Sequence, residues 1–168
     1  MAGEDSLFCE HSGIDFEAIK SAYRNNQTQA KRRGGSTITQ QTAKNVFFWN
    51  GGGLIRKAGE AWFALLTDFV WGKTRMMEIY LNVAEWGDGL FGIEAAAQAR
   101  FGTTARELTE RQSALLASVL PSPNKWKASP AGPYVTQRAT TLQARMAVIR
   151  TSGYDRCVKP KASIKPLK

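Results

Sequence analysis

The chain has 168 residues, of which 43% are hydrophobic, and it carries a formal net charge of +9. This length and hydrophobic content predict one domain with one core and exclude an intrinsically disordered chain. The positive charge favours an anionic partner, such as nucleic acid, an acidic membrane surface or a phosphorylated substrate, without choosing among them.

The spacing of apolar residues predicts a mostly α fold, and we find no segment that alternates convincingly as a strand would. Asp15 is expected to cap the first helix, which carries Phe16, Ile19 and Tyr23 on one face. In chain order, the predicted helices cover residues 15–23, 39–48, 55–70, 74–83, 93–101, 109–120 and 134–150.

The two central predicted helices contain many of the bulky apolar residues. In the helix at 55–70 these are Ile55, Trp62, Leu65, Leu66 and Phe69. In the helix at 74–83 we expect three side chains to point inward, namely Met76, Met77 and Tyr80.

Glycine and proline separate these helices. We expect an exposed basic loop at residues 27–35, a flexible break at 50–53 and a glycine-rich turn at 87–92. Thr109 and Gln112 form a capping box that opens the helix at 109–120. Such long loops are uncommon in a compact domain unless they serve a function.

Residues 1–157 are expected to form the domain, and residues 158–168 a basic, disordered tail. The chain opens abruptly on the charged pair Glu4-Asp5, so we expect that an upstream segment is missing. The sequence has no run of about 18 apolar residues, which excludes a membrane-spanning helix within it.

Cys9 and Cys157 lie near opposite ends of the chain, without CxxC spacing or a His-rich tract, so we do not expect a zinc site. Whether the two form a disulfide stays open, because separation along the chain gives no distance in space. The cysteines therefore do not settle the cellular compartment.

Residues 32–45, RRGGSTITQQTAKN, combine many hydrogen-bonding groups with little bulk and with positive charge at both ends. Gly34 and Gly35 let backbone amides approach a ligand closely. The hydroxyl and amide side chains suit a sugar, and the cations suit phosphate. This pattern indicates a site for a diphosphate-linked sugar. A polar linker is the competing interpretation, whereas the order of glycines and lysine excludes a Walker A loop.

The N-terminal segment holds two adjacent acids, Glu4 and Asp5, followed by His11, the only histidine of the chain. Taken alone, the acids suit the first turn of a helix, and a single histidine is more often structural than catalytic. The segment is therefore a candidate site only in combination with the others.

Arg56 and Lys57 precede Glu60 by four and three residues, so the three side chains share one face of a helix. The simpler interpretation of this spacing is a surface ion pair worth about 0.5 kcal/mol or less. A glutamate beside two cations would also suit chemistry at a phosphate. Two further segments, at 80–97 and 114–123, look structural by themselves.

These five segments, in this order, resemble the glycosyltransferase domain of peptidoglycan polymerases, glycosyltransferase family 51, and within it the monofunctional enzymes. The resemblance covers roughly residues 3 to 150. The matching motifs are EDxxFxxHxG at Glu4, Asp5, Phe8, His11 and Gly13, GGSTITQQ at Gly34 to Gln41, RKxxE at Arg56 to Glu60, YLN with spaced glycines and alanines at Tyr80 to Ala97, and ALLA with spaced prolines at Ala114 to Pro123.

The resemblance implies a lysozyme-like, mostly α fold that acts on lipid II, a disaccharide-pentapeptide carried on undecaprenyl pyrophosphate. The reaction polymerises glycan strands by β-1,4 linkage, with inversion at the sugar carbon and release of undecaprenyl pyrophosphate. No cofactor is implied as a requirement, and a divalent cation (Mg²⁺ or Mn²⁺) at Glu60 stays open.

The resemblance also implies the catalytic roles. Glu4 matches the general base that takes the proton of the acceptor 4-hydroxyl, while Asp5 shapes the site. Glu60 matches a second carboxylate that helps the leaving group, directly or through a divalent cation. We expect at least one of Glu4 and Glu60 to have a raised pKa. The implied substrate-binding residues are His11, Gly35, Ser36, Thr37, Gln40, Gln41, Lys44, Asn45, Arg56 and Lys57, and among them Lys44, Arg56 and Lys57 would stabilise the departing pyrophosphate.

The implied partners are lipid II, the growing glycan strand, an anionic membrane surface and other cell-wall synthesis proteins, and not nucleic acid. The implied location is the bacterial inner membrane, with the catalytic domain facing the periplasm. The family's usual membrane helix and the transpeptidase domain of bifunctional relatives are absent from this sequence. Phe47, Phe48 and Trp49 either contact the membrane or fill the core.

Two positions depart from the family pattern. Residues 50–53, Asn-Gly-Gly-Gly, lack the arginine that many relatives have there, so we expect phosphate binding to depend on Lys44 and Arg56, with Arg32 or Arg33 as a further candidate. Thr42 replaces the usual aliphatic residue, and we expect little effect.

Two other functions remain as alternatives. A lytic glycosidase of the same fold would need an acid for the leaving sugar oxygen and has no use for cations around a pyrophosphate. A non-enzymatic basic binding module would not depend on Glu4 or Glu60.

Overall fold

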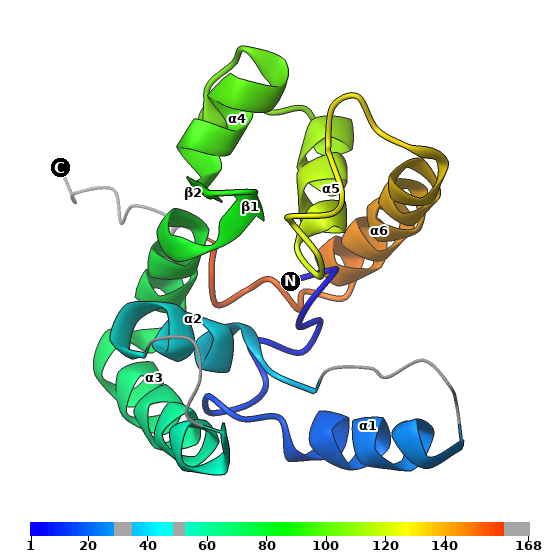
Figure 1. Cartoon of the computed structure of the whole chain (residues 1–168). Coiled ribbons are helices and arrows are strands. Elements are labelled where there is room, and N and C mark those ends of the chain that lie inside the picture. Colours follow the sequence, from blue (N-terminus) through cyan, green and yellow to red (C-terminus); the bar gives the residue numbers. More distant parts are fainter. Residues whose placement is uncertain (29–34, 49–52, 160–168) are drawn as a thin grey trace, which may run out of the picture.

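The computed structural model describes residues 1–28, 35–48 and 53–159, which form a mostly α domain (Figure 1). The mostly α prediction is therefore confirmed. In chain order the elements are α1 (Phe16–Thr28), α2 (Ile38–Phe47), α3 (Gly53–Val83), β1 (Glu85–Gly87), β2 (Leu90–Phe91), α4 (Ile93–Phe101), the 3₁₀ turn η1 (Ala105–Glu107), α5 (Glu110–Val119) and α6 (Pro133–Thr151).

The helices form two groups around the N-terminal segment. Figure 1 shows α1, α2 and the first half of α3 on one side and α4, α5 and α6 on the other, with the segment before α1 running between them. Within these groups, α2 packs on α3 and α5 packs on α6. The N-terminal segment, which carries the first motif, therefore contacts the interior of the domain.

Local capping explains where several helices begin. The side chain of Asp15 accepts a hydrogen bond from the amide of Ala18, as expected at the start of α1. Thr109 caps α5 through the predicted capping box with Gln112. A second capping box, between Thr37 and Gln40, opens α2 and was not predicted. In each box a side-chain oxygen satisfies an amide that the first helical turn leaves without a partner.

The helices predicted at 55–70 and 74–83 are one element, α3, with a kink at Gly72. Gly72 has φ of 66°, a left-handed conformation that glycine adopts without a steric penalty. The glycine-rich turn at 87–92 contains a short antiparallel pair, β1 and β2, that the sequence did not indicate. Two strands of three and two residues are too short to show an alternating pattern.

The core lies where the second half of α3 meets the N-terminal segment, α2 and α5. Met76 and Tyr80 are buried, as predicted, and Met77 is partly buried against the same cluster. The buried hydrophobic residues of this cluster are Phe8, Ile38, Met76, Tyr80, Ala84, Trp86, Ala96, Leu116, Val119, Ala128 and Val135.

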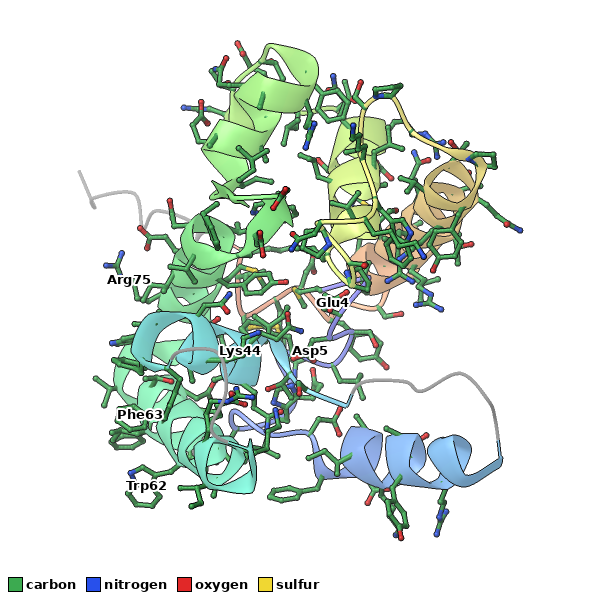
Figure 2. All side chains as sticks on the ribbon, in the orientation of Figure 1. Glu4, Asp5, Lys44, Trp62, Phe63 and Arg75 are labelled. Carbon is green, nitrogen blue, oxygen red and sulfur yellow. A yellow bond between two sulfur atoms is a disulfide. The ribbon has the colours of Figure 1, made fainter. Side chains whose placement is uncertain are left out.

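The apolar face of the first half of α3 is exposed. Ile55 and Phe69 are both 88% exposed, and Trp62 is 66% exposed. Their spacing of seven residues places them on one face of the helix, and Figure 2 shows Trp62 at the outer edge of the molecule. Among the described residues, no helix is long and apolar enough to cross a membrane.

Phe47 and Phe48 lie beside this face without being part of the core. Their rings contact that of Phe63, at centroid distances of 4.8 Å and 5.5 Å. Phe47 is still 39% exposed. Trp49 lies outside the described residues, as do most of the predicted basic loop at 27–35, most of the break at 50–53 and most of the tail at 158–168.

A disulfide joins Cys9 to Cys157, a pairing that the sequence left open. It fastens the segment after α6 to the N-terminal segment across 148 positions of the chain. Arg156 and Glu10 form an ion pair beside it, and the hydroxyl of Thr74 donates to the carbonyl of Cys157 at 2.8 Å. These contacts hold the first motif from its outer side.

We predict that replacing Cys157 with serine lowers the free energy of unfolding by about 2–4 kcal/mol, because the open chain gains conformational entropy when it unfolds. Urea unfolding followed by circular dichroism measures the change. The double replacement Cys9→Ser/Cys157→Ser should cost no more than the single one. A wild-type protein whose stability is unchanged by dithiothreitol would contradict the prediction.

Candidate active site

Glu4 lies at the centre of the molecule, between α2 and α6 (Figure 2). The side-chain amide of Gln41 donates to one carboxylate oxygen at 3.2 Å. The guanidinium of Arg138 lies 3.8 Å from the other oxygen. The Glu4 side chain is 16% exposed, so most of the carboxylate is shielded from water while part stays accessible.

Burial raises the pKa of Glu4, and the hydrogen bond from Gln41 and the charge of Arg138 oppose that rise only in part. The expectation that at least one of the two carboxylates has a raised pKa is confirmed. A carboxylate in this environment is a stronger proton acceptor than an ordinary surface glutamate.

Asp5, the neighbour of Glu4, is buried and bridges two other parts of the chain. One of its oxygens accepts from the backbone amide of Ile38, in the first turn of α2, at 3.0 Å. Nε2 of His11 lies 3.0 Å and 3.1 Å from its two oxygens. Since both oxygens of Asp5 are engaged, Asp5 connects the first motif to the second, and Glu4 is the more accessible acid of the pair.

Thr37 and Gln40 are buried and form the capping box of α2. The hydroxyl of Thr37 also donates to the carbonyl of Gly13 at 2.6 Å. The hydroxyl of Thr37 and the side-chain oxygen of Gln40, two predicted substrate contacts, therefore have partners within the protein. The backbone of Gly35 lies close to α1: a Cβ at this position would lie 3.2 Å from the Cα of Ile19.

Ser36 connects the second motif to the third. Its hydroxyl oxygen lies 3.1 Å from the ammonium of Lys57. It also lines a small cavity of about 110 Å³ together with Glu4. Ser36 thus stands between the N-terminal carboxylate and the cations of α3.

Glu60 is 1% exposed and pairs with both cations of its motif. Arg56 binds one carboxylate oxygen, and Lys57 binds the other at 2.9 Å. The simpler sequence interpretation, an exposed ion pair, is wrong about burial: Lys57 is half exposed, but the carboxylate beneath it is not. Glu60 therefore anchors two cations whose outer sides are accessible.

The pKa of Lys57 is lowered by partial burial and by the nearby charges of Arg56 and Lys44. Like charges that repel one another favour the binding of an anion, since an anion relieves the repulsion. Lys44, on the exposed side of α2, lines a polar cavity of about 800 Å³ with Gln41 and Asn45. The amide of Asn45 donates to the carbonyl of Val83, which holds α2 against the end of α3.

A divalent cation at Glu60 does not fit these residues. Both carboxylate oxygens already bind cationic side chains, and Mg²⁺ or Mn²⁺ would have to displace them. Within residues 1–28, 35–48 and 53–159, no cluster of three or more His, Cys, Asp or Glu side chains is arranged to hold a metal ion.

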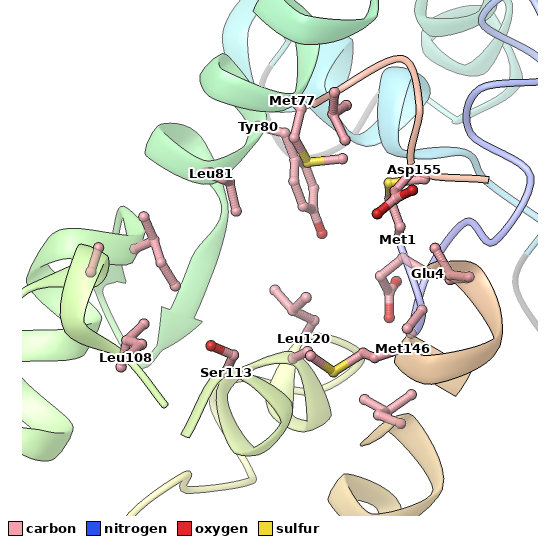
Figure 3. Close-up of a pocket in the computed structure, with 18 of the residues that line it drawn as sticks. Met1, Glu4, Met77, Tyr80, Leu81, Leu108, Ser113, Leu120, Met146 and Asp155 are labelled. Atoms are coloured by element: carbon pink, nitrogen blue, oxygen red, sulfur yellow. The ribbon is translucent and has the colours of Figure 1, made fainter. Parts of the chain in front are cut away.

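A second large cavity, of about 470 Å³, is also lined by Tyr80 (Figure 3). Its walls include Met77, Leu81 and Met146, with Glu4 at its edge. Mostly apolar walls offer few partners to a diphosphate, so the polar cavity with Lys44 suits that group better, whereas Glu4 lines the apolar cavity and the small cavity that also contains Ser36. Tyr80 and Leu120 contribute to the walls of both cavities.

Sequence reasoning missed two residues beside Glu4. No motif contains Arg138. A single arginine in an amphipathic helix looks like an ordinary surface residue. Tyr80 was predicted as a core residue and as the first residue of the fourth motif, but without a role beside Glu4. It is buried, and burial followed by the negative charges of Glu4 and Asp5 raises its pKa. Its hydroxyl has no hydrogen-bond partner among the described residues.

The arrangement combines a partly shielded carboxylate with a group of cations on the far side of Ser36. Such a carboxylate can remove a proton from an alcohol, and the cations can bind a phosphate group. The site is thus equipped for an alcohol that attacks a carbon bearing a diphosphate.

Comparisons with known proteins agree with this chemistry. Residues 1–147 match the protein-family model described as Transglycosylase. Three relatives named biosynthetic peptidoglycan transglycosylase are similar to the chain. The protein of Caulobacter vibrioides is 52% identical over 158 residues, which is 94% of this chain and 69% of the relative. That of Rhodospirillum centenum is 46% identical over 94% of this chain and 68% of the relative. That of Pseudomonas aeruginosa is 51% identical over 87% of this chain and 63% of the relative.

We predict that Asp5→Asn lowers the free energy of unfolding by about 1–3 kcal/mol, because the amide cannot serve both the Ile38 amide and His11 as a charged acceptor. Urea unfolding measures the loss. Asp15→Asn is the matched control, since asparagine caps a helix as well as aspartate does, and it should stay within about 0.5 kcal/mol of wild type. Equal effects of the two replacements would argue against the bridging role of Asp5.

Proposed function

The chain belongs to the transglycosylase family, and we propose that it is a peptidoglycan glycosyltransferase that polymerises lipid II into β-1,4 glycan strands with release of undecaprenyl pyrophosphate. The observation that carries the proposal is the position of Glu4, a partly shielded carboxylate that lines a small cavity together with Ser36, whose hydroxyl oxygen accepts from the ammonium of Lys57.

Glu4 acts as the general base. As the 4-hydroxyl of the acceptor sugar attacks the anomeric carbon of the donor, its O–H bond breaks and the proton passes to the Glu4 carboxylate. The hydrogen bond from Gln41 orients this carboxylate. Attack opposite the leaving group inverts the anomeric carbon and yields the β linkage.

The cations of α2 and α3 hold the leaving group. As the bond between the anomeric carbon and the pyrophosphate breaks, negative charge grows on the phosphate oxygens, and Lys57, Arg56 and Lys44 stabilise it. Glu60 keeps Arg56 and Lys57 in place from below. No metal ion is needed in this account, because the cationic side chains supply the charge.

The geometry argues against a lytic glycosidase. Such an enzyme usually places two carboxyl groups on either side of the scissile bond. Here Glu60 is buried and neutralised by two cations, so it cannot act as a second carboxyl group at a glycosidic bond. A non-enzymatic binding module can be distinguished from a glycosyltransferase by replacing Glu4, because its binding would not depend on that carboxylate.

The domain functions outside the cytoplasm, at the cell wall, and we place it at the periplasmic surface of the inner membrane. A lipid-linked substrate requires the site to lie close to a bilayer. The exposed apolar face of α3, with Ile55, Trp62 and Phe69, supports contact with the membrane, and the net charge of +9 favours anionic lipids.

We predict that Glu4→Gln lowers polymerisation of lipid II by about 10²–10⁴-fold, because the amide cannot accept the hydroxyl proton. Gel analysis of labelled glycan strands measures the product, and moenomycin, a phosphoglycolipid inhibitor of the family, identifies the specific signal. Glu10→Gln, an exposed acid of the same segment, should retain activity. Normal turnover by a folded Glu4→Gln variant would exclude Glu4 as the base.

The pH dependence of polymerisation should report the raised pKa of Glu4. The base is active only when charged, so kcat/KM is complete above this pKa and falls as the pH drops through it. Burial raises the pKa, so the fall should occur at a higher pH than an ordinary glutamate would give. An acid limb in the usual glutamate range would argue against this assignment.

We predict that Trp62→Ser/Phe69→Ser weakens binding to vesicles of anionic phospholipid by at least about tenfold, because two large apolar side chains no longer enter the bilayer surface. Co-sedimentation with the vesicles measures the binding. Val148→Ser removes a side chain on α6 that is 58% exposed and should leave binding unchanged. Equal losses in both variants would remove the α3 face as the contact.

A further inference from the structure

Arg138 reaches Glu4 from the side opposite Gln41. It lies on α6, and its guanidinium is 3.8 Å from Oε1 of Glu4, whereas Gln41 of α2 donates to Oε2. The Arg138 side chain is 24% exposed, which leaves the contact only partly screened by water. The carboxylate therefore has a helix on each side of it.

Glu4 is the acid partner of Arg138 among the described residues. Nε of Arg138 is buried and has no hydrogen-bond partner within that part of the chain. The remaining walls of the small cavity beside it contain no acid, since they come from Tyr134, Gln137, Thr141, Leu142 and Arg145. The contact with Glu4 is therefore the interaction that explains the position of the Arg138 guanidinium on α6.

Five groups from four parts of the chain face the Glu4 carboxylate. Gln41 and Arg138 favour its charged form, and the α-amino group of Met1 does so as well. Asp5 disfavours it, and the buried hydroxyl of Tyr80 remains neutral at ordinary pH. Among the side chains, Arg138 is the one whose positive charge opposes the effect of burial.

We propose that Arg138 is a positioning residue, which holds the Glu4 carboxylate in place from α6 and keeps it charged until the acceptor sugar binds. The inference rests on the proposed function, in which Glu4 is the base. The sugar that enters the cleft displaces water, which disfavours a charged carboxylate further. A nearby guanidinium limits this effect, so the base remains able to take a proton.

The attraction between Arg138 and Glu4 acts only before the proton is transferred. When the acceptor O–H bond breaks and the proton moves to Glu4, the carboxylate becomes neutral and its attraction to Arg138 is lost. Arg138 thus maintains the reactive form of the base and does not stabilise the proton transfer itself. Its removal should therefore act most strongly where protonation of Glu4 limits the rate.

The first test is the pH profile of kcat/KM for lipid II polymerisation in Arg138→Met, Arg138→Lys and Arg145→Met. Arg138→Met should move the acid limb to higher pH, with a loss of about tenfold on that limb and less than about threefold on the plateau. Arg138→Lys keeps the charge and should restore the limb. Arg145→Met, two helical turns further along α6, should match wild type. Equal losses at every pH would overturn the proposal.

The second test does not depend on activity. In ¹³C-labelled protein, the carboxyl resonance of Glu4 can be assigned by its absence in Glu4→Gln and then titrated. Its midpoint should rise in Arg138→Met and stay in place in Arg145→Met. Arg138→Gln repeats the measurement if the methionine variant does not fold, as judged by circular dichroism. An unchanged midpoint in a folded variant overturns the proposal.

The two tests separate failure of this inference from failure of the proposed function. If the midpoint rises but a folded Glu4→Gln variant still polymerises lipid II normally, Arg138 holds Glu4 as proposed and Glu4 is not the base. If Glu4→Gln is inactive but no Arg138 variant moves the midpoint, the proposed function stands and Arg138 has no positioning role.

Discussion

The buried carboxylate of Asp5 is the contact on which the candidate site depends. It joins the first turn of α2 to His11 and thereby fixes the N-terminal segment against the second motif. Its neighbour Glu4 is then held within hydrogen-bonding distance of Gln41, one helical turn further along α2. A buried charge is tolerated only when its hydrogen bonds are satisfied, so the same interaction supports both the fold and the position of Glu4.

The two glutamates of the site are treated differently by their surroundings. Glu60 is fully buried, but an arginine and a lysine each bind one of its oxygens. Glu4 is less buried and only partly compensated, and burial raises its pKa. Environments of this kind assign different roles to identical side chains. In the proposed function, Glu60 serves as an anchor for cations and Glu4 exchanges a proton.

The apolar residues of α3 illustrate what a periodic pattern leaves undecided. The repeat predicts a helix with an apolar face in both halves of α3, but only the second half places that face in the core. In the first half, Ile55 and Phe69 are exposed. Periodicity reports that one face is apolar and does not report what covers it. In the proposed function, the bilayer covers the exposed apolar face of the first half of α3.

By itself, the sequence determined the features that arise between residues close in the chain: the helices, although it divided α3 into two, the capping box at Thr109, and the order of the motifs with Glu4, Asp5, Arg56, Lys57 and Glu60. Only the tertiary structure decided which distant groups meet. It paired Cys9 with Cys157, joined the hydroxyl of Thr37 to the carbonyl of Gly13, buried Glu60 and brought Arg138 to Glu4. Backbone capping and helical periodicity act over a few residues, whereas these contacts join segments up to 148 positions apart, and no local pattern encodes their distance in space.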